Sequence, residues 1–294
     1  MSVIRIDSVV LSVRDLAEAT AFWSDLLGLE FRPPQASGGP PPQHVYTAHA
    51  AADDRAHPRT VQSVIGLELM ERGPEPRLEG IRCVVFEVDN MDAAKVRMAA
   101  AGIRCTHMMH MRGFEEAVYM ADDLRGVRVV LRRYEAGATS RPRGVAGGNI
   151  EKIDRVSLNV KSCDEAIRFW SGILGLVFPP GSHDPQRIRE RGKVTHGFTE
   201  WADDDEKARP IAAISTTGIE LMERDPPLGR EGFRGLVLKV RDIEEAKARL
   251  ASRGVRLLHT IDVGDVVKQA IYHPDDLHGT RLTLCQRAWQ QPYF

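Results

Sequence analysis

The stretch IDSVVLSV at residues 6–13 decides the fold, because it returns as IDRVSLNV at residues 153–160. Further segments of the first half return in the same order: AFWSDLLGLEF at 21–31 as RFWSGILGLVF at 168–178, GLELMERGP at 66–74 as GIELMERDP at 218–226, VRMAAAGIR at 96–104 as ARLASRGVR at 248–256, and DDLRG at 122–126 as DDLHG at 275–279. Repeats of this length and order indicate a tandem duplication. We expect one copy at 1–134, a Gly-, Ser- and Pro-containing linker at 135–150, and the second copy at 151–294.

Each copy has two similar halves. The segment IRIDSVVLSV alternates as a strand, and the next segment places Leu16, Trp23 and Leu27 at helical spacing. Strand-like runs follow around Phe31, at 44–49 and at 62–71. The plan then restarts with the strand IRCVVFEV, a helix over 90–101, and strands around Cys105, Tyr119 and Val129. The predicted fold is α+β, with four βαβββ units that form two tandem half-barrel domains, each enclosing a cleft.

The bulk composition is that of a globular protein with a small-molecule partner. Of 294 residues, 43% are apolar and 28% charged, and the formal net charge of −1 argues against nucleic acid or a membrane surface as partner. No signal-like N-terminus or long apolar run is visible, and four cysteines without a CxxC pair suit a reducing compartment. We therefore expect a cytoplasmic protein, which could form a homodimer. The acidic run at 203–206 is interpreted as a solvated loop.

The repeated motifs resemble the vicinal oxygen chelate superfamily of glyoxalases, extradiol dioxygenases and bleomycin-resistance proteins. The resemblance rests on the I-D-x-V-x-L-x-V strand, the FWxxxLGL helix end, the GLEL strand, the VFEVDN step and the D-D-L-x-G turn, and it covers nearly the whole chain. It implies a cleft in which four strand positions hold a divalent metal through His, Glu, His or Gln, and Glu.

By this resemblance the four metal-ligand positions fall on Ser8, Glu68, Cys83 and Val130 in the first copy. In the second copy they fall on Arg155, Glu220, Gly235 and Thr283. Only the glutamate fits the family pattern, since valine and glycine have no donor atom and arginine repels a cation. We therefore expect no cofactor of the standard kind.

The polar residues that recur between the copies are the candidates for chemistry. The candidate catalytic residues are Glu68, Glu220, His44, His196, Tyr119 and Tyr272, and the candidate substrate-binding residues are Arg155, Arg128, Arg281, His107 and His259. Strand alternation puts Glu68 and Met70 on the face opposite Leu67 and Leu69, which is the cleft face by the family comparison. Histidine, glutamate and arginine together offer a base, an acid and an anion clamp.

Three functions stay open. The first is isomerase- or lyase-type acid–base chemistry on an oxygenated, aromatic or carboxylated small molecule. The second is a binding or resistance protein without chemistry. The third is a glyoxalase- or dioxygenase-like metal enzyme with displaced ligands, in which His44, His49 and His57, or His183, His196 and Glu220, would converge.

Overall fold

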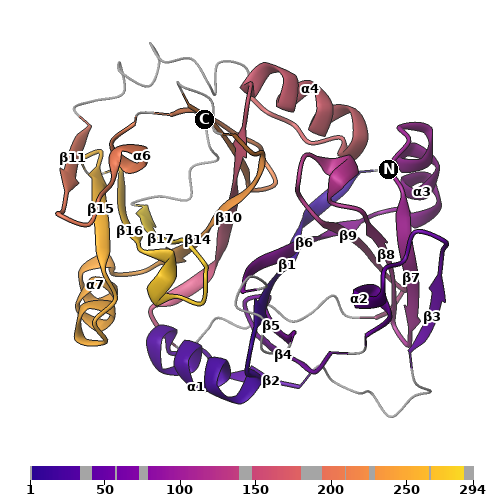
Figure 1. The fold of residues 1–294 in the computed structure, drawn as a ribbon, viewed down its shortest axis with the longest axis horizontal. Coiled ribbons are helices and arrows are strands. Elements are labelled where there is room, and N and C mark those ends of the chain that lie inside the picture. Colours follow the sequence, from indigo (N-terminus) through magenta and orange to yellow (C-terminus); the bar gives the residue numbers. More distant parts are fainter. Residues whose placement is uncertain are drawn as a thin grey trace.

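The structure is a computed structural model, which describes residues 2–33, 42–56, 58–72, 79–138, 148–179, 194–208, 210–224, 229–264 and 266–287. Within these ranges the chain builds two strongly curved sheets side by side, one from each copy (Figure 1). No helix in these ranges is long and apolar enough to cross a membrane. His57 and His183, two of the proposed displaced metal ligands, lie outside them.

The first sheet has the strand order β2-β4-β5-β1-β6-β9-β8-β7-β3. Its strands are β1 (Val3–Val13), β2 (Phe31–Arg32), β3 (Gln43–Tyr46), β4 (Thr60–Ser63), β5 (Leu67–Glu71), β6 (Gly80–Val88), β7 (Cys105–Met111), β8 (Phe114–Tyr119) and β9 (Val129–Tyr134). The two halves of the copy meet where β1 pairs antiparallel with β6, so the two units pair within one copy.

The second sheet repeats this plan in the order β11-β15-β16-β17-β14-β10-β13-β12. Its strands are β10 (Ile150–Val160), β11 (Thr195–Phe198), β12 (Ile211–Ile214), β13 (Ile219–Glu223), β14 (Gly232–Val240), β15 (Leu257–Asp262), β16 (Val267–Tyr272) and β17 (Leu282–Arg287). Even the register recurs: Val10 lies between Glu68 and Cys83, and Ser157 lies between Glu220 and Gly235.

Four helices of ten or twelve residues cover the convex faces of the sheets: α1 (Leu16–Leu27), α3 (Met91–Ala100), α4 (Cys163–Leu174) and α7 (Ile243–Ser252). Asp15 caps the N-terminus of α1 by accepting from the Glu18 amide, and Ser162 does the same for α4. Gly28 and Gly175 end these helices in the left-handed conformation, at φ of 67° and 69°. The short 3-10 helices η2 (Asp122–Leu124) and η3 (Pro274–Asp276) belong to the D-D-L-x-G turns.

The apolar core lies between the sheets and these helices. Trp23 and Trp170 are fully buried in it, as are Leu67 and Leu69 of β5. A separate apolar cluster lies on the concave face of the first sheet and consists of Val10, Cys83, Val85, Val118 and Val130, with Met70 packed against it. The predicted alternation of Leu67 and Leu69 against Met70 is therefore confirmed.

The two domains hold each other through their turns and helices. Helix α1 packs against α7 of the other domain, and α3 packs against α4. The glycine of each D-D-L-x-G turn is needed for close approach: a Cβ on Gly126 would lie 2.5 Å from the carbonyl oxygen of Glu231, and one on Gly279 would lie 2.9 Å from that of Glu79. These turns therefore dock on the partner domain.

The chain between β2 and β5 departs from the predicted plan in three ways. The run at 62–71 is two strands, β4 and β5, separated by a turn. Strand β3 leaves its own half and pairs with β7 at the far edge of the sheet. It is followed by a one-turn helix, α2 (Ala52–Arg55), which lies inside the curve of the first sheet, and α6 (Asp204–Lys207) lies in the same way inside the second (Figure 1). Neither short helix was predicted.

Candidate functional site

The four family ligand positions of each copy lie on adjacent central strands. In the first domain, Ser8 of β1 and Val130 of β9 lie on either side of Val85 of β6. Cys83 of β6 lies opposite Val10 of β1. The thiol of Cys83 is buried in the concave apolar cluster, and burial raises its pKa to about 12. This part of the first cleft is a dry, apolar floor.

The second domain places charge on the same part of the cleft. Arg155 is 2% exposed and pairs with Asp154 at 2.9 Å and with Glu220 at 3.1 Å. The Ser157 hydroxyl also donates to Glu220. A side chain at Gly235 has no room, because its Cβ would lie 2.9 Å from the Arg281 carbonyl oxygen. Arg155 therefore neutralises a glutamate of the protein itself.

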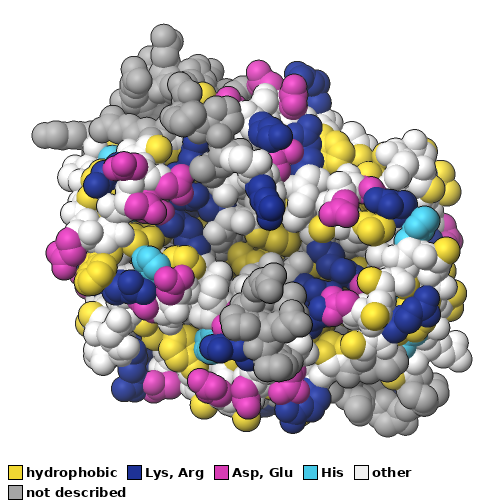
Figure 2. Space-filling view, viewed as in Figure 1, with side chains coloured by type: hydrophobic (Ala, Val, Ile, Leu, Met, Phe, Trp, Pro, Cys, Tyr) yellow, Lys and Arg dark blue, Asp and Glu magenta, His cyan; other side chains and the backbone are white. Residues whose placement is uncertain are grey.

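A feature common to both clefts is a set of three arginines, which we call the arginine cluster. It consists of Arg72, Arg82 and Arg128 in the first domain and of Arg224, Arg234 and Arg281 in the second. In each cleft the cluster surrounds the carboxylates of the one-turn helix. Figure 2 shows dark-blue side chains gathered in the middle of each half of this face, with magenta ones beside them.

In the first cleft, Asp53 of α2 forms ion pairs with Arg72 and with Arg82, the latter at 2.8 Å. Asp54, whose side chain is 3% exposed, pairs with Arg128 and accepts from the Ala51 amide. Burial, together with the charges of Arg82 and Arg128, lowers the pKa of Arg72 to about 10. The arginines therefore repel one another and need anionic partners.

In the second cleft, Asp205 of α6 pairs with Arg224 and with Arg234 at 3.2 Å. Glu206 pairs with Arg281 and lies 3.1 Å from the Nδ1 atom of His259. Burial alone would raise the pKa of Glu206, but the hydrogen bonds from His259 and Arg281 lower it to about 2. The interpretation of 203–206 as a solvated loop was wrong for Asp205 and Glu206, because both face the arginine cluster.

The predicted histidines gather beside these clusters. The rings of His44 and His107 lie 6.0 Å apart in the first domain, and those of His196 and His259 lie 6.2 Å apart in the second. Burial lowers the pKa of His107, while the charge of Asp54 opposes this shift. His107 and His259 therefore share the cleft with Arg128 and Arg281, and their role in substrate binding stays a prediction.

Glu68 lies on the same concave face, close enough to raise the pKa of Cys83 and of Arg132. Arg132 itself is buried between Asp7 and Glu116. This second charged group lies on the β1, β8 and β9 side of the floor. Glu68 is therefore in the cleft as predicted, beside a structural ion-pair network.

The two tyrosines are placed elsewhere, so the expectation that they act in the cleft was wrong in position. Tyr119 and Tyr272 belong to the core between sheet and helices. On the strand of Tyr119, the side chains of Val118 and Glu116 face the cleft instead. Burial raises the pKa of both hydroxyl groups. A tyrosine on the helix-facing side cannot reach a ligand on the concave side.

The proposed displaced metal ligands that the structure describes, His44, His49, His196 and Glu220, form no group that could share an ion. Among the described residues, the one group of carboxylates and imidazoles close enough to share an ion is Asp203, Asp205 and Glu206, which contains none of them. Two of these carboxylates are already paired with arginines.

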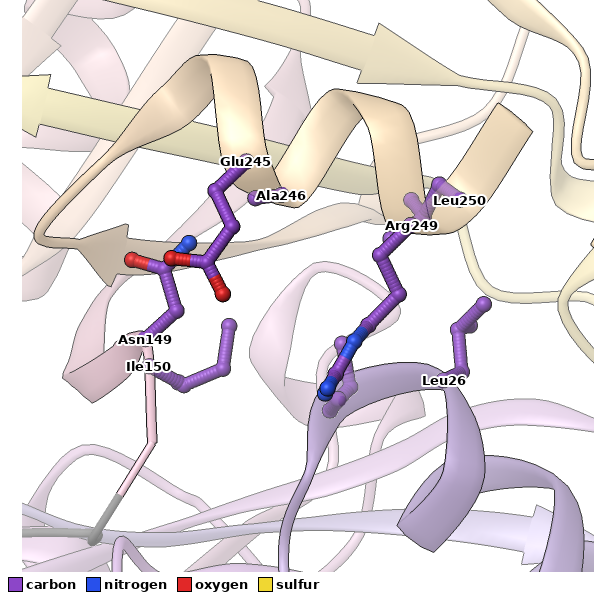
Figure 3. Close-up of a pocket in the computed structure, with 8 residues that line it drawn as sticks. Leu26, Asn149, Ile150, Glu245, Ala246, Arg249 and Leu250 are labelled. Atoms are coloured by element: carbon purple, nitrogen blue, oxygen red, sulfur yellow. The ribbon is translucent and has the colours of Figure 1, made fainter. Parts of the chain in front are cut away.

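A crevice between α1 and α7 lies outside both clefts. It is lined by residues such as Leu26 and Arg249 and has a volume of only about 10 Å³, which is too small for a substrate (Figure 3).

The family is shown by comparison with known proteins. The model of the Glyoxalase/Bleomycin resistance protein/Dioxygenase superfamily matches residues 5–131 and again residues 152–282. The chain belongs to this superfamily. No curated protein matches the sequence significantly.

Solved structures share the fold over nearly the whole chain. They include the Mn(II)-bound glyoxalase from Novosphingobium aromaticivorans, which is 13% identical with a TM-score of 0.58 over 98% of this chain and 83% of its own. The 2,3-dioxygenase LapB from Pseudomonas sp. KL28 is 13% identical with a TM-score of 0.58 over 100% of this chain and 96% of its own. The catechol dioxygenase BphC is 14% identical with a TM-score of 0.60 over 97% and 87%. At such identities the likeness shows the two-domain fold and no more.

Proposed function

We propose that the clefts bind a carboxylated small molecule and that the chain catalyses proton transfer next to a carbonyl group of this molecule. The observation that carries the proposal is the arginine cluster, which is built from equivalent strands in both domains. Guanidinium groups match carboxylates in shape and charge, and they stabilise the negative oxygen that forms when a proton leaves the neighbouring carbon.

The proton acceptor in the first cleft is His107. Burial lowers its pKa, so its imidazole is kept neutral near pH 7 and is able to take up a proton. It lies beside Asp54 and Arg128, where a carboxylate held by the arginine cluster would bring its neighbouring carbon within reach. His259 has the same place in the second cleft beside Glu206.

The proposal needs no metal of the family's usual kind. Val130 and Gly235 supply no donor atom, and Arg155 places a cation on the first strand of the second cleft. These residues do not fit a divalent ion held by histidine and glutamate. We therefore assign the electrophilic role to the arginines.

The proposal is tested by solvent deuterium incorporation. A panel of 2-oxo acids is incubated with the protein in D2O, and proton NMR follows the signal of the carbon next to the carbonyl group. We expect exchange for at least one acid, and a loss of at least tenfold in rate for the double variant His107→Gln/His259→Gln. The matched control is His110→Gln, an exposed histidine of the same strand β7.

A second function, binding of a small molecule without chemistry, is favoured by one observation. The floor around Cys83 and Val130 is apolar, which suits binding of a ligand more than catalysis. If carboxylic acids raise the melting temperature but none exchanges its proton, the catalytic proposal fails and the binding function replaces it.

A further inference from the structure

Each cleft contains a one-turn helix that has no apolar anchor. The single buried side chain of α2 is Asp54, and that of α6 is Glu206. Helices of four residues are unstable by themselves in water. Ion pairs with the arginine clusters therefore hold these two helices inside the sheets, while Thr47 and Thr199 bond the segments before them to β7 and β15.

The ion pairs follow the pattern of a ligand with two carboxylates. Asp53 contacts Arg72 and Arg82, while Asp54 contacts Arg128. In the second cleft the facing oxygens of Asp205 and Glu206 lie within 4.8 Å of each other. Asp205 contacts Arg224, Glu206 contacts Arg281, and Arg234 lies between them and contacts both carboxylates. The arginine cluster thus recognises two carboxylates held a short distance apart.

We infer that short dicarboxylates are the ligand class of both clefts, and that such a ligand takes the place of the acidic helix in the arginine cluster. This inference rests on the proposed function, because it names the substrate class of the same site. The exchange is balanced in charge: the ligand remakes the ion pairs that the helix gives up, and the helix carboxylates return to water.

A monocarboxylate does not complete this exchange. It neutralises one part of the cluster and leaves other buried guanidinium groups without an anion once the helix moves away, which is costly. The structure therefore predicts selection for two carboxylates over one.

The first cleft opens more readily than the second. Asp53 is 42% exposed, and Asp54 makes its ion pair with a single arginine, Arg128. Glu206 has Arg281, Arg234 and His259 around it. Because α6 has more partners to give up, we expect α2 to leave its cluster at a lower dicarboxylate concentration.

The experiment is hydrogen–deuterium exchange of the full chain with malonate, succinate, acetate or phosphate at constant ionic strength. We expect malonate or succinate to speed exchange of the α2 amides, which are protected by the bonds from Asp54 N–H to the Ala51 carbonyl and from Ala56 N–H to the Ala52 carbonyl. The strands that carry the arginines should exchange more slowly. Slower exchange at α2, no change, or an equal effect of acetate or phosphate would overturn the inference.

Variants supply the second test. Asp53→Asn/Asp54→Asn removes the competing charges, so we expect malonate or succinate to bind at least tenfold more tightly. Arg128→Gln should weaken binding at least tenfold, and the exposed control Asp92→Asn should leave it unchanged. Weaker binding by the double Asn variant would overturn the inference. Both tests measure binding without a reaction. Binding with helix release but without deuterium incorporation into the ligand would therefore refute the proposed reaction and not the ligand class.

Discussion

The two clefts of this chain share the arginine cluster, which with its acidic helix forms the rim of each cleft, and they differ in the residues of their floor. Both keep three arginines around an acidic one-turn helix, with a histidine beside it. The floor of the first is apolar around Cys83 and Val130 and carries the Arg132 ion pairs to one side, whereas that of the second carries the buried pair of Arg155 and Glu220 at its centre. The duplicated part that both copies retain is therefore the arginine cluster with its acidic helix, and the floor is the part that has diverged.

This difference separates two roles for buried charge. The rim ion pairs involve side chains of short helices that lack apolar packing, so a ligand can compete for them. The floor ion pairs connect strands of the sheet itself, as Arg132 does between Asp7 and Glu116. Floor variants should therefore affect stability, and rim variants should affect binding.

The largest effect is expected when the floor network of the first domain is broken. Arg132→Met leaves Asp7 and Glu116 buried without their arginine, which should lower the free energy of unfolding by about 3–5 kcal/mol. Urea denaturation measures this change. The control Arg133→Met removes a more exposed pair with Glu115 and should cost about 0–1 kcal/mol.

The same substitution in the second domain sharpens the comparison. Arg155→Met should cost less than Arg132→Met, because Asp154 keeps Arg287 at 3.0 Å and Glu220 keeps the Ser157 hydroxyl. After Arg132→Met, Asp7 keeps Arg5 and the Tyr134 hydroxyl, but Glu116 loses the arginine that it contacts. An equal or larger loss of unfolding free energy for Arg155→Met would contradict this difference between the two floors.

The next effect concerns acid stability of the second rim. The pKa of Glu206 falls from 4.5 to about 2 on folding, so this carboxylate adds stability above pH 4.5 and loses it as the pH falls toward 2. The full contribution is about 3 kcal/mol. Glu206→Gln should therefore lower stability at pH 7 and flatten its decline between pH 4.5 and 2, as measured by urea denaturation at a series of pH values. An unchanged decline would contradict this assignment.

The smallest effect distinguishes the two contacts between domains. Glu79 pairs with His278 at 3.1 Å on one side, and the equivalent Glu231 pairs with Arg125 at 2.8 Å on the other. The guanidinium group of Arg125 is always charged. Glu79 also keeps Arg14 at 3.2 Å when His278 is replaced. We therefore expect Arg125→Gln to lower the free energy of unfolding by about 1 kcal/mol and His278→Gln to lower it by less, as measured by urea denaturation. An equal or larger loss for His278→Gln would refute the difference.

The sequence predicted the fold well because the duplication displays its strand and helix patterns twice. Alternation placed Glu68 on the concave face, and the helical spacing of Leu16, Trp23 and Leu27 matches helix α1. The tyrosines were misplaced because neighbouring strand positions face opposite sides, so a shift of one residue moves a side chain from cleft to core.

The acidic helices were missed because a run of four charged residues usually lies in solvent. A signal did exist, since Asp53 and Asp54 recur as Asp205 and Glu206, while Arg72 and Arg224 both end the repeated L-M-E-R motif. That these acidic and basic residues meet inside the cleft depends on β3 crossing to the far edge of the sheet, a long-range pairing that local patterns do not contain.

The most direct measurement is a calorimetric titration of succinate or malonate into the wild-type chain and into the rim variants Arg82→Gln and Arg234→Gln, with folding checked by circular dichroism. The account predicts one equivalent of ligand per cleft in the wild type, loss of one equivalent in each single variant, and no binding in the double variant. Full binding by the double variant would contradict the claim that the arginine clusters are the ligand sites.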